Sequence, residues 1–342
     1  MELRIHHERS ITHSVPMKAL VSATAELTGA LARLDRKVAD GASPTPLDRQ
    51  RIQALFARWN RHLQQALGSS SSLDDRIQPL VSQWLRDQVQ PYILRSSIGY
   101  RAIRKPEGYA GDFSTILELY ERSPRGADPV GELMDAAILR LDAAWAVYHR
   151  RRLLADEIRR THARIDGRPV RVTSLASGPA EELVEACTAL EGGRPLAMTL
   201  MDIDAGALDH ARRVLDIPGS PHTVTGLRCN LIHVARGRTP LELPPQDLIY
   251  SAGLIDYLND DVVVGLMDAA HGWLRPGCRL ILGNIHPCNP DRAFMDHVAE
   301  WPLIHRTEAD LDHLYRRSRF GRPCTRIRFE PQGLNLFAEC VR

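Results

Sequence analysis

The sequence predicts an α/β protein in which a helical N-terminal part precedes a mainly parallel, doubly wound sheet. Two observations predict this division. The first 160 residues carry apolar stripes at helical spacing, whereas beyond Gly167 short apolar runs alternate with helical segments. Strands that alternate with helices form parallel sheets covered by helices on both faces. We therefore expect a helical domain at residues 1–160 and an α/β domain at residues 161–342.

The helical part reveals its elements through apolar periodicity. Apolar side chains recur every three or four positions over residues 52–67, with Thr45 and Pro46 as a start signal and Gly68 as a stop. Further helices are expected at about residues 75–90 and 113–120, and two more between about residues 131 and 162. Two glycines and a proline within residues 105–112 predict an ordered loop, with Asp112 capping the next helix. We expect this domain to serve as a lid or an oligomerisation region, compatible with a homodimer.

The α/β part alternates strands with helices. Short apolar runs predict buried strands at residues 170–176, 197–203, 246–252 and 278–285. Helical periodicity is seen at residues 207–215 and 262–274, and Arg275-Pro276-Gly277 is expected to close the latter helix. Two apolar segments near the C-terminus flank Pro331-Gln332-Gly333, which predicts an antiparallel hairpin.

The composition argues against several classes of protein. The formal net charge is only +2, which gives no reason to expect a nucleic-acid partner. No apolar run approaches the roughly 18 residues of a membrane span, and the polar N-terminus, with its His6-His7 pair, lacks the apolar segment of a signal peptide. The six cysteines are scattered without a C-x-x-C pair. We therefore expect a cytoplasmic protein with reduced thiols and no metal requirement.

A basic stretch at residues 149–152, with Arg159, Arg160 and Arg164, is interleaved with acidic side chains. We interpret it as a solvated helix face, from which one arginine could meet the carboxylate of a cofactor.

Two features predict a ligand site where the strands end. The strand at residues 170–176 enters a turn at Ser177-Gly178-Pro179, in which Gly178 lets a ligand approach the backbone and Pro179 suits a helix start. Asp202 ends the next strand, 24 positions after Gly178, where an acidic residue can accept hydrogen bonds from a ribose diol. Asp204 fits the role of a helix cap better than Asp202 does. In a doubly wound fold, ligands bind beyond the carboxyl ends of the strands.

A third feature lies at the end of the strand at residues 246–252. Small residues follow it, and then come Asp256 and Tyr257, for which we expect ligand contacts. This places polar groups at the same edge of the sheet as Gly178 and Asp202.

Together these features resemble the class I S-adenosylmethionine-dependent methyltransferases, over roughly residues 165–342. The resemblance implies a Rossmann-like seven-stranded sheet that ends in an antiparallel hairpin. It assigns the methionine part of the cofactor to Ala176, Ser177 and Gly178, the ribose to Asp202, and the adenine to Ile203, Asn230 and Leu231. It also implies that Tyr250, Ser251 and Gly253 lie beside the reactive centre. The glycine-rich turn usual in the family is reduced here to Ser177-Gly178-Pro179.

A narrower resemblance involves the bacterial group typified by the enzyme that makes the signal 3-hydroxypalmitate methyl ester. It rests on residues 105–112, 250–258, 283–287, 294–296 and 300–304. Two positions depart from that pattern, because Glu107 replaces a usual basic residue and Phe113 the usual final aromatic one. These departures point to a different substrate within the group.

Candidate catalytic residues come from two segments. His286 follows a strand at the expected active edge and could act as a base or a hydrogen-bond donor, while Asn284 could orient a polar group. Tyr109 and Asp112 lie on a loop that could fold over the cofactor.

The leading hypothesis is methyl transfer from S-adenosylmethionine to a small molecule of secondary metabolism. The acceptor would be a carboxylate or an amine of an acyl- or amino-acid-derived compound. One alternative is an enzyme that consumes the same cofactor without moving its methyl group, such as a cyclase that releases methylthioadenosine. Another is a degenerate cofactor-binding sensor.

Overall fold

The structure is a computed structural model that describes residues 15–68, 73–74, 76–190 and 194–342. The His6-His7 pair lies outside these residues. The chain divides into a helical unit, which ends at Trp145 and includes Asn289–Pro302, and an α/β unit of Ala146–Cys288 and Leu303–Arg342. The boundary expected near residue 160 falls inside a continuous helix, α8 (Asp142–Arg164).

The helical unit contains three long helices and several shorter ones. Its described helices are α2 (Val15–Ala39), α3 (Pro46–Leu67), α4 (Gln78–Ile93), α5 (Ser97–Arg104), α6 (Phe113–Glu121), α7 (Pro129–Ile138) and α13 (Arg292–His297). The start signal at Thr45 is confirmed, because its hydroxyl accepts from the backbone N–H of Asp48 while the Asp48 carboxylate accepts from the backbone N–H of Thr45. The predicted cap at Asp112 is confirmed as well, because its side chain accepts from the backbone N–H of Thr115.

Trp59 lies at the centre of the helical unit. Its side chain is fully buried and donates from the indole N–H to the hydroxyl of Thr24 on α2, at 3.1 Å. The rings of Phe56 and Phe294 pack against it with centroids 5.4 and 6.2 Å away. Because Phe294 belongs to α13, the segment after β5 completes this core.

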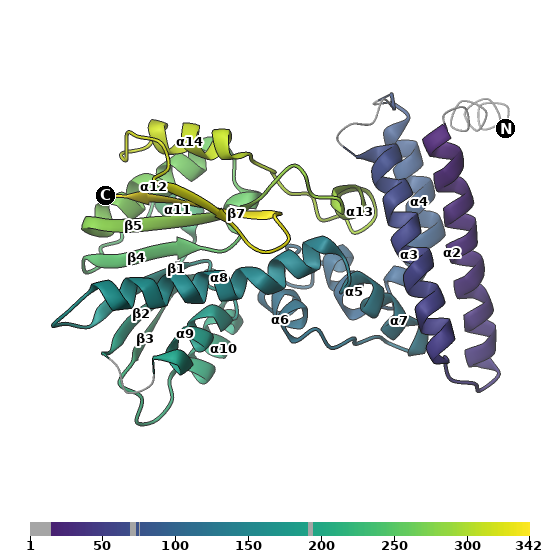
Figure 1. Ribbon diagram of the computed structural model, residues 1–342, viewed down its shortest axis with the longest axis horizontal. Coiled ribbons are helices and arrows are strands. Elements are labelled where there is room, and N and C mark those ends of the chain that lie inside the picture. Colours follow the sequence, from purple (N-terminus) through teal and green to yellow (C-terminus); the bar gives the residue numbers. More distant parts are fainter. Residues whose placement is uncertain (1–14, 69–72, 75, 191–193) are drawn as a thin grey trace. The chain divides into compact units, whose positions relative to one another are not determined.

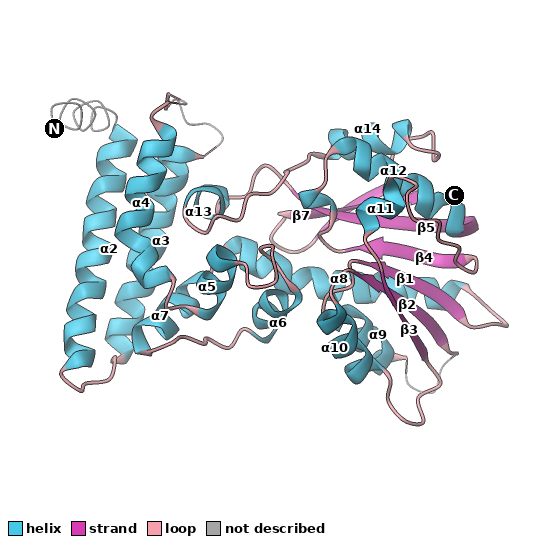
Figure 2. Cartoon of the chain, turned by 180° about the vertical axis from the view of Figure 1, so that it is seen from behind, coloured by secondary structure: helices cyan, strands magenta, loops and turns pink. Residues whose placement is uncertain are grey.

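The α/β unit is built on one seven-stranded sheet (Figure 2), which confirms the predicted fold class. The strands are β1 (Val170–Leu175), β2 (Leu196–Asp202), β3 (Thr223–Arg228), β4 (Gln246–Ser251), β5 (Leu274–Ile285), β6 (Arg326–Phe329) and β7 (Asn335–Val341), in the order β3-β2-β1-β4-β5-β7-β6. The first five are parallel, and β7 pairs antiparallel with both β5 and β6. The triplet Arg275-Pro276-Gly277, expected to close the helix at residues 262–274, lies within β5, which begins directly after α12 ends at Trp273.

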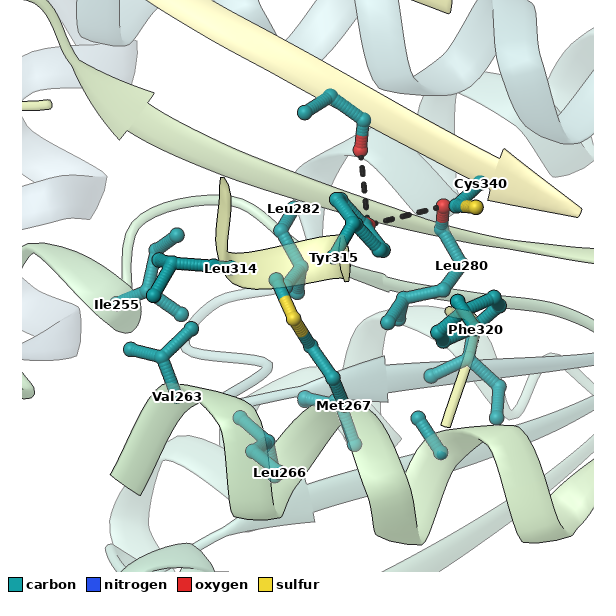
Figure 3. Close-up of a cluster of buried hydrophobic side chains, with 14 of the residues drawn as sticks. Ile255, Val263, Leu266, Met267, Leu280, Leu282, Leu314, Tyr315, Phe320 and Cys340 are labelled. Carbon is teal, nitrogen blue, oxygen red and sulfur yellow. Dashed lines mark hydrogen bonds between the residues drawn. The ribbon is translucent and has the colours of Figure 1, made fainter. Parts of the chain in front are cut away.

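Helices cover both faces of this sheet (Figure 1). The helices α8, α9 (Glu181–Ala189) and α10 (Ala205–Leu215) pack on one face. The helices α11 (Leu231–Ala235), α12 (Asp260–Trp273) and α14 (Glu308–Arg317) pack on the other face. Within this second layer the hydroxyl of Tyr315 donates to the carbonyl oxygens of Leu280 and Ala338, so a fully buried phenol ties α14 to two strands (Figure 3).

Candidate functional site

The turn after β1 has an unusual backbone. Ala176, Gly178 and Ala180 all have positive φ, at 52°, 52° and 56°. This conformation costs an L-residue other than glycine about 1–2 kcal/mol and tends to occur where a ligand is bound. A side chain at Gly178 would point into open space, since no atom lies within 4 Å of the position of its Cβ. The turn is therefore strained and leaves room for a ligand above Gly178.

Asp202 faces this turn from the end of β2. Its Oδ2 accepts from the N–H of Gly178 and its Oδ1 from the N–H of Asp204, at 2.9 and 3.0 Å. Burial, which leaves the residue 5% exposed, raises the pKa of this carboxyl, and the two N–H groups oppose that rise. A carboxylate has about four acceptor positions, so two remain for a diol. Asp204 caps α10 by accepting from the N–H of Gly206, as the sequence predicted.

The polar groups of the turn favour one type of ligand over another. The N–H groups of Ser177, Gly178 and Ala180 are all bonded within the protein, so none points at a phosphate. The first turn of α9 also carries Glu181 and Glu182, which repel an anion at that helix end. By contrast, the buried hydroxyl oxygen of Ser177 has no hydrogen-bond partner. The turn therefore suits a polar, non-phosphate ligand.

The predicted adenine residues differ in their exposure. Ile203 is 52% exposed beside Asp202 and offers an apolar surface. Asn230 caps α11 with its side-chain oxygen, and Leu231 is buried in the core below. Ser251 is fully buried and donates to the carbonyl of Leu175, so its side chain joins β4 to β1.

Gly253, Asp256 and Arg150 come together beyond β4. A Cβ at Gly253 would lie 2.9 Å from Nη1 of Arg150 and 3.3 Å from Oδ2 of Asp256. Oδ1 of Asp256 accepts from the N–H of Ile285, at 2.7 Å. Burial raises the pKa of Asp256 to about 7, against the opposing effects of the Ile285 N–H and the charges of Arg150 and Arg306.

The interpretation of the basic stretch as a solvated face is wrong for Arg150, which is 7% exposed, although Arg152 is exposed. Glu182, also buried, accepts from the hydroxyl of Tyr250 at 2.7 Å, and burial raises its pKa. The charge of Arg150 acts on both Glu182 and Asp256. The burial of Arg150 and Glu182 was not predicted, since spacing alone does not tell which residue of a charged run faces inward.

Asn284 is fully buried and occupied by the framework. Its amide donates to the carbonyls of Ile285 and Ile304, and its Oδ1 accepts from Arg306. These bonds fix the end of β5 against the following loop. The expected contact of Asn284 with a substrate is not favoured by this arrangement, because its polar atoms are engaged inside the protein.

His286 lies directly after β5. Its Nδ1 accepts from the N–H of Cys288, at 3.1 Å, and its Nε2 lies 3.3 Å from a carboxylate oxygen of Glu308. An accepting Nδ1 means that the neutral ring carries its proton on Nε2. The ring is thus arranged as a donor at Nε2.

The remaining candidates lie in two places. Tyr257 is 41% exposed at the end of the 3₁₀ turn η1 (Ile255–Tyr257). Tyr109 and Asp112 belong to the helical unit, where the fully buried Asp112 pairs with Arg101 at 2.7 Å. The contact of this loop with a cofactor stays a prediction.

Two properties of the described residues concern possible metal and membrane partners. No group of three or more His, Cys, Asp or Glu side chains there could hold a metal ion. Over the same residues, no helix is long and apolar enough to cross a bilayer.

No protein-family model and no curated protein sequence matches the chain. A solved structure of a possible exported protein from Bordetella parapertussis has 18% identity and a TM-score of 0.53, over 87% of this chain and 99% of that one. The apo form of the S-adenosylmethionine-dependent methyltransferase SibL has 18% identity and a TM-score of 0.46, over 94% and 96%. The 1,6-didemethyltoxoflavin-N1-methyltransferase of Burkholderia thailandensis has 18% identity and a TM-score of 0.40, over 58% of this chain and 80% of that one. At such identities the first likeness establishes a shared fold.

Proposed function

We propose that the chain binds S-adenosylmethionine at the carboxyl edge of its sheet and transfers the methyl group to a small molecule. The observation that carries this proposal is the contact between Asp202 and the turn at Gly178. In the strand order β3-β2-β1-β4-β5, the connections leave β1 and β4 in opposite directions, and ligands bind at such a switch point. Gly178 follows β1 at that point, and Asp202 contacts it from the end of the neighbouring strand β2.

The charges at this edge favour a cationic ligand over a dinucleotide. Glu182, Asp202 and Asp256 are buried acids, and the buried cations whose charges act on Asp256 are Arg150 and Arg306. A pyrophosphate would meet these acids without a free amide to hold it. A sulfonium and an ammonium group, which S-adenosylmethionine carries, suit an acidic surrounding.

The residues of the turn fit the cofactor. Asp202 would accept from the ribose diol, the partnerless hydroxyl of Ser177 would bond to a polar ligand atom, and exposed Ile203 would cover the adenine. Asn230 and Leu231 would border the adenine through their backbone. When bound, the cofactor supplies a methyl group that a nucleophile can displace from sulfur. The task of the protein is to align that nucleophile and to exclude water.

The chemical class of the methyl acceptor determines whether the reaction needs a catalytic base. A carboxylate acceptor requires no base, whereas an amine or hydroxyl requires one. Both ring nitrogens of His286 are engaged within the protein, Nδ1 with the N–H of Cys288 and Nε2 beside the carboxylate of Glu308, so the ring offers a substrate no unengaged base. We therefore favour a carboxylate acceptor, consistent with the resemblance to enzymes that form methyl esters. Tyr257 and the loop with Tyr109 and Asp112 remain candidates for substrate contact.

The helical unit is proposed as a lid or an oligomerisation region, and the enzyme as a cytoplasmic protein of secondary metabolism. Its oligomeric state can be measured by light scattering, with a homodimer as the expected result.

The test is calorimetric titration with S-adenosylmethionine, followed by mass spectrometry of the incubated cofactor. Binding with slow formation of S-adenosylhomocysteine supports a methyltransferase and justifies a screen of small carboxylates. Methylthioadenosine well above the level without enzyme would instead indicate a cyclase. Binding without either product would indicate a sensor, and the absence of binding would remove the proposed function while leaving the fold.

A further inference from the structure

A cluster of arginines surrounds Glu157 at the edge of the sheet that β6 forms. The strands β4, β5 and β7 lie between this edge strand and β1, so the cluster is separate from the proposed cofactor site. Glu157 is a buried residue of α8. Its carboxylate is bonded by Arg160 of α8, Arg279 of β5, and Arg326 and Arg328 of β6. Four guanidinium groups thus share one buried carboxylate.

The carboxylates of this cluster do not balance its arginines. The second carboxylate belongs to Glu339 of β7, and Arg279 and Arg326 both bond to its Oε2, each at 2.8 Å. The nearby Asp156 pairs with an arginine of its own, Arg159. Two positive charges of the cluster therefore remain without a counter-charge among these residues.

This excess charge is unfavourable for the side chains that lie deepest. Burial, together with the charges of Arg326 and Arg160, lowers the pKa of Arg279, and Glu339 opposes that shift. Burial also lowers the pKa of Arg328. A lowered pKa means that the protein disfavours the charged form of these two guanidinium groups. An anion with a matching charge would offset the repulsion, so its binding would be favoured.

The cluster has donors left for such an anion. Arg160 bonds to Glu157 through Nη1, whereas Arg326 and Arg328 bond to it through Nη2. Within the part of the chain that the structure describes, the other nitrogens of these three guanidinium groups have no hydrogen-bond partner. The side chains of Arg160, Arg326 and Arg328 are 47%, 36% and 25% exposed, so a ligand can reach them from solvent.

A phosphate group matches this cluster in charge and in geometry. As a monoester it carries a charge of about −1.5 to −2 at pH 7 and three strong acceptor oxygens. The planar guanidinium group binds phosphate oxygens through two parallel N–H donors. A single carboxylate would bring only one charge and would leave part of the excess in place.

We propose that Arg160, Arg326 and Arg328 form a binding site for a phosphate group, beside the buried carboxylate of Glu157. The site is independent of the proposed methyl transfer and adds a second ligand to this chain. A bound phosphate would connect α8 to the edge strand β6, because Arg160 comes from the helix and the other two arginines from the strand. Free phosphate and a phosphate monoester share this chemistry.

The experiment measures saturable binding of inorganic phosphate and of glycerol phosphate to the protein by phosphorus NMR, at about pH 8. Chloride keeps the ionic strength constant. Binding is compared for the wild type, Arg160→Met, Arg328→Met and the control Arg316→Met, which removes an exposed arginine of α14. We expect Arg160→Met and Arg328→Met each to raise the dissociation constant about tenfold, the size of one lost charge-assisted bond. The control should change it less than about twofold.

The two probes separate the two sources of the phosphate group. Tighter binding of glycerol phosphate would identify a phosphorylated small molecule as the ligand, and equal binding would identify the phosphate group alone. Either result supports the site if the two substitutions weaken it.

Arg160→Met guards against a folding defect in Arg328→Met, because Arg160 is exposed and Glu157 keeps three other arginines. The absence of saturable binding to the wild type would overturn the site. The arginines would then only keep the edge strand from pairing with another sheet. Equal affinities of the wild type and both variants would overturn the site as well. Neither outcome depends on whether the protein binds S-adenosylmethionine.

Discussion

Arg306 holds the loop that carries Gly253 and Asp256, so its replacement tests how that loop is built. The side chain is 3% exposed and donates to the carbonyls of Ile255 and Leu258, at 2.7 and 2.6 Å, and to Oδ1 of Asn284, at 3.0 Å. Arg306→Met keeps much of the stem but removes every donor. A buried acceptor that loses its partner costs about 1–3 kcal/mol. With incomplete additivity over three acceptors, we expect a loss of about 3–5 kcal/mol.

A chain with two compact units can unfold in more than one step. The stability of the α/β unit is therefore measured by native-state hydrogen exchange of the amides in α12, which follows this loop. Arg317→Met is the control, because Arg317 pairs at 2.7 Å with Asp261, whose side chain is 87% exposed. We expect the control to cost less than about 1 kcal/mol. Equal effects of the two substitutions would refute the role given to Arg306.

Three further predictions concern separate parts of the chain. Asp256→Asn should remove a pH dependence of the stability. In the folded protein the pKa of Asp256 is about 7, above the ordinary value of 3.8. The stability that the protonated carboxyl contributes to the wild type is therefore lost as pH rises from about 4 to 7, by at most about 4 kcal/mol. A constant difference between variant and wild type in urea unfolding from pH 4 to 8 would contradict this. Gly131→Ala should destabilise the helical unit by about 1–3 kcal/mol or more, because its Cβ would lie 2.1 Å from the carbonyl oxygen of Arg95; thermal melting should show no such loss for the control Gly272→Ala, which has open space. Tyr250→Phe should cost about 1–3 kcal/mol of stability in urea unfolding, since it leaves the buried carboxyl of Glu182 without its donor at 2.7 Å. An unchanged stability would mean that this hydrogen bond adds nothing.

The sequence predicted those features that depend on local pattern. Apolar runs located β1, β2, β4 and β5, because a strand buried on both faces is apolar throughout. The caps at Thr45, Asp112 and Asp204 were predictable because each acts on backbone groups two or three residues away.

Features that depend on distant contacts were not predictable. The burial of Arg150 follows from how α8 is turned against the sheet, which the spacing of a charged run does not define. Residues 289–302 join the helical unit because Phe294 packs on Trp59 and Asp291 accepts from Asn60, more than 200 positions away. Asn284 looked available for a substrate, but its partners Ile304 and Arg306 come from a later loop.

The central claim is that Asp202 holds the ribose of an adenosine-containing cofactor. The most direct measurement is the affinity for S-adenosylhomocysteine, by calorimetry, of the wild type, Asp202→Ala and the control Asp204→Ala, which removes only the cap of α10. We expect Asp202→Ala to lose about 1–3 kcal/mol of binding free energy, the cost of leaving polar groups unpaired. The control should lose about 1 kcal/mol of stability without a change in affinity. Equal affinity of Asp202→Ala and the wild type would contradict the account.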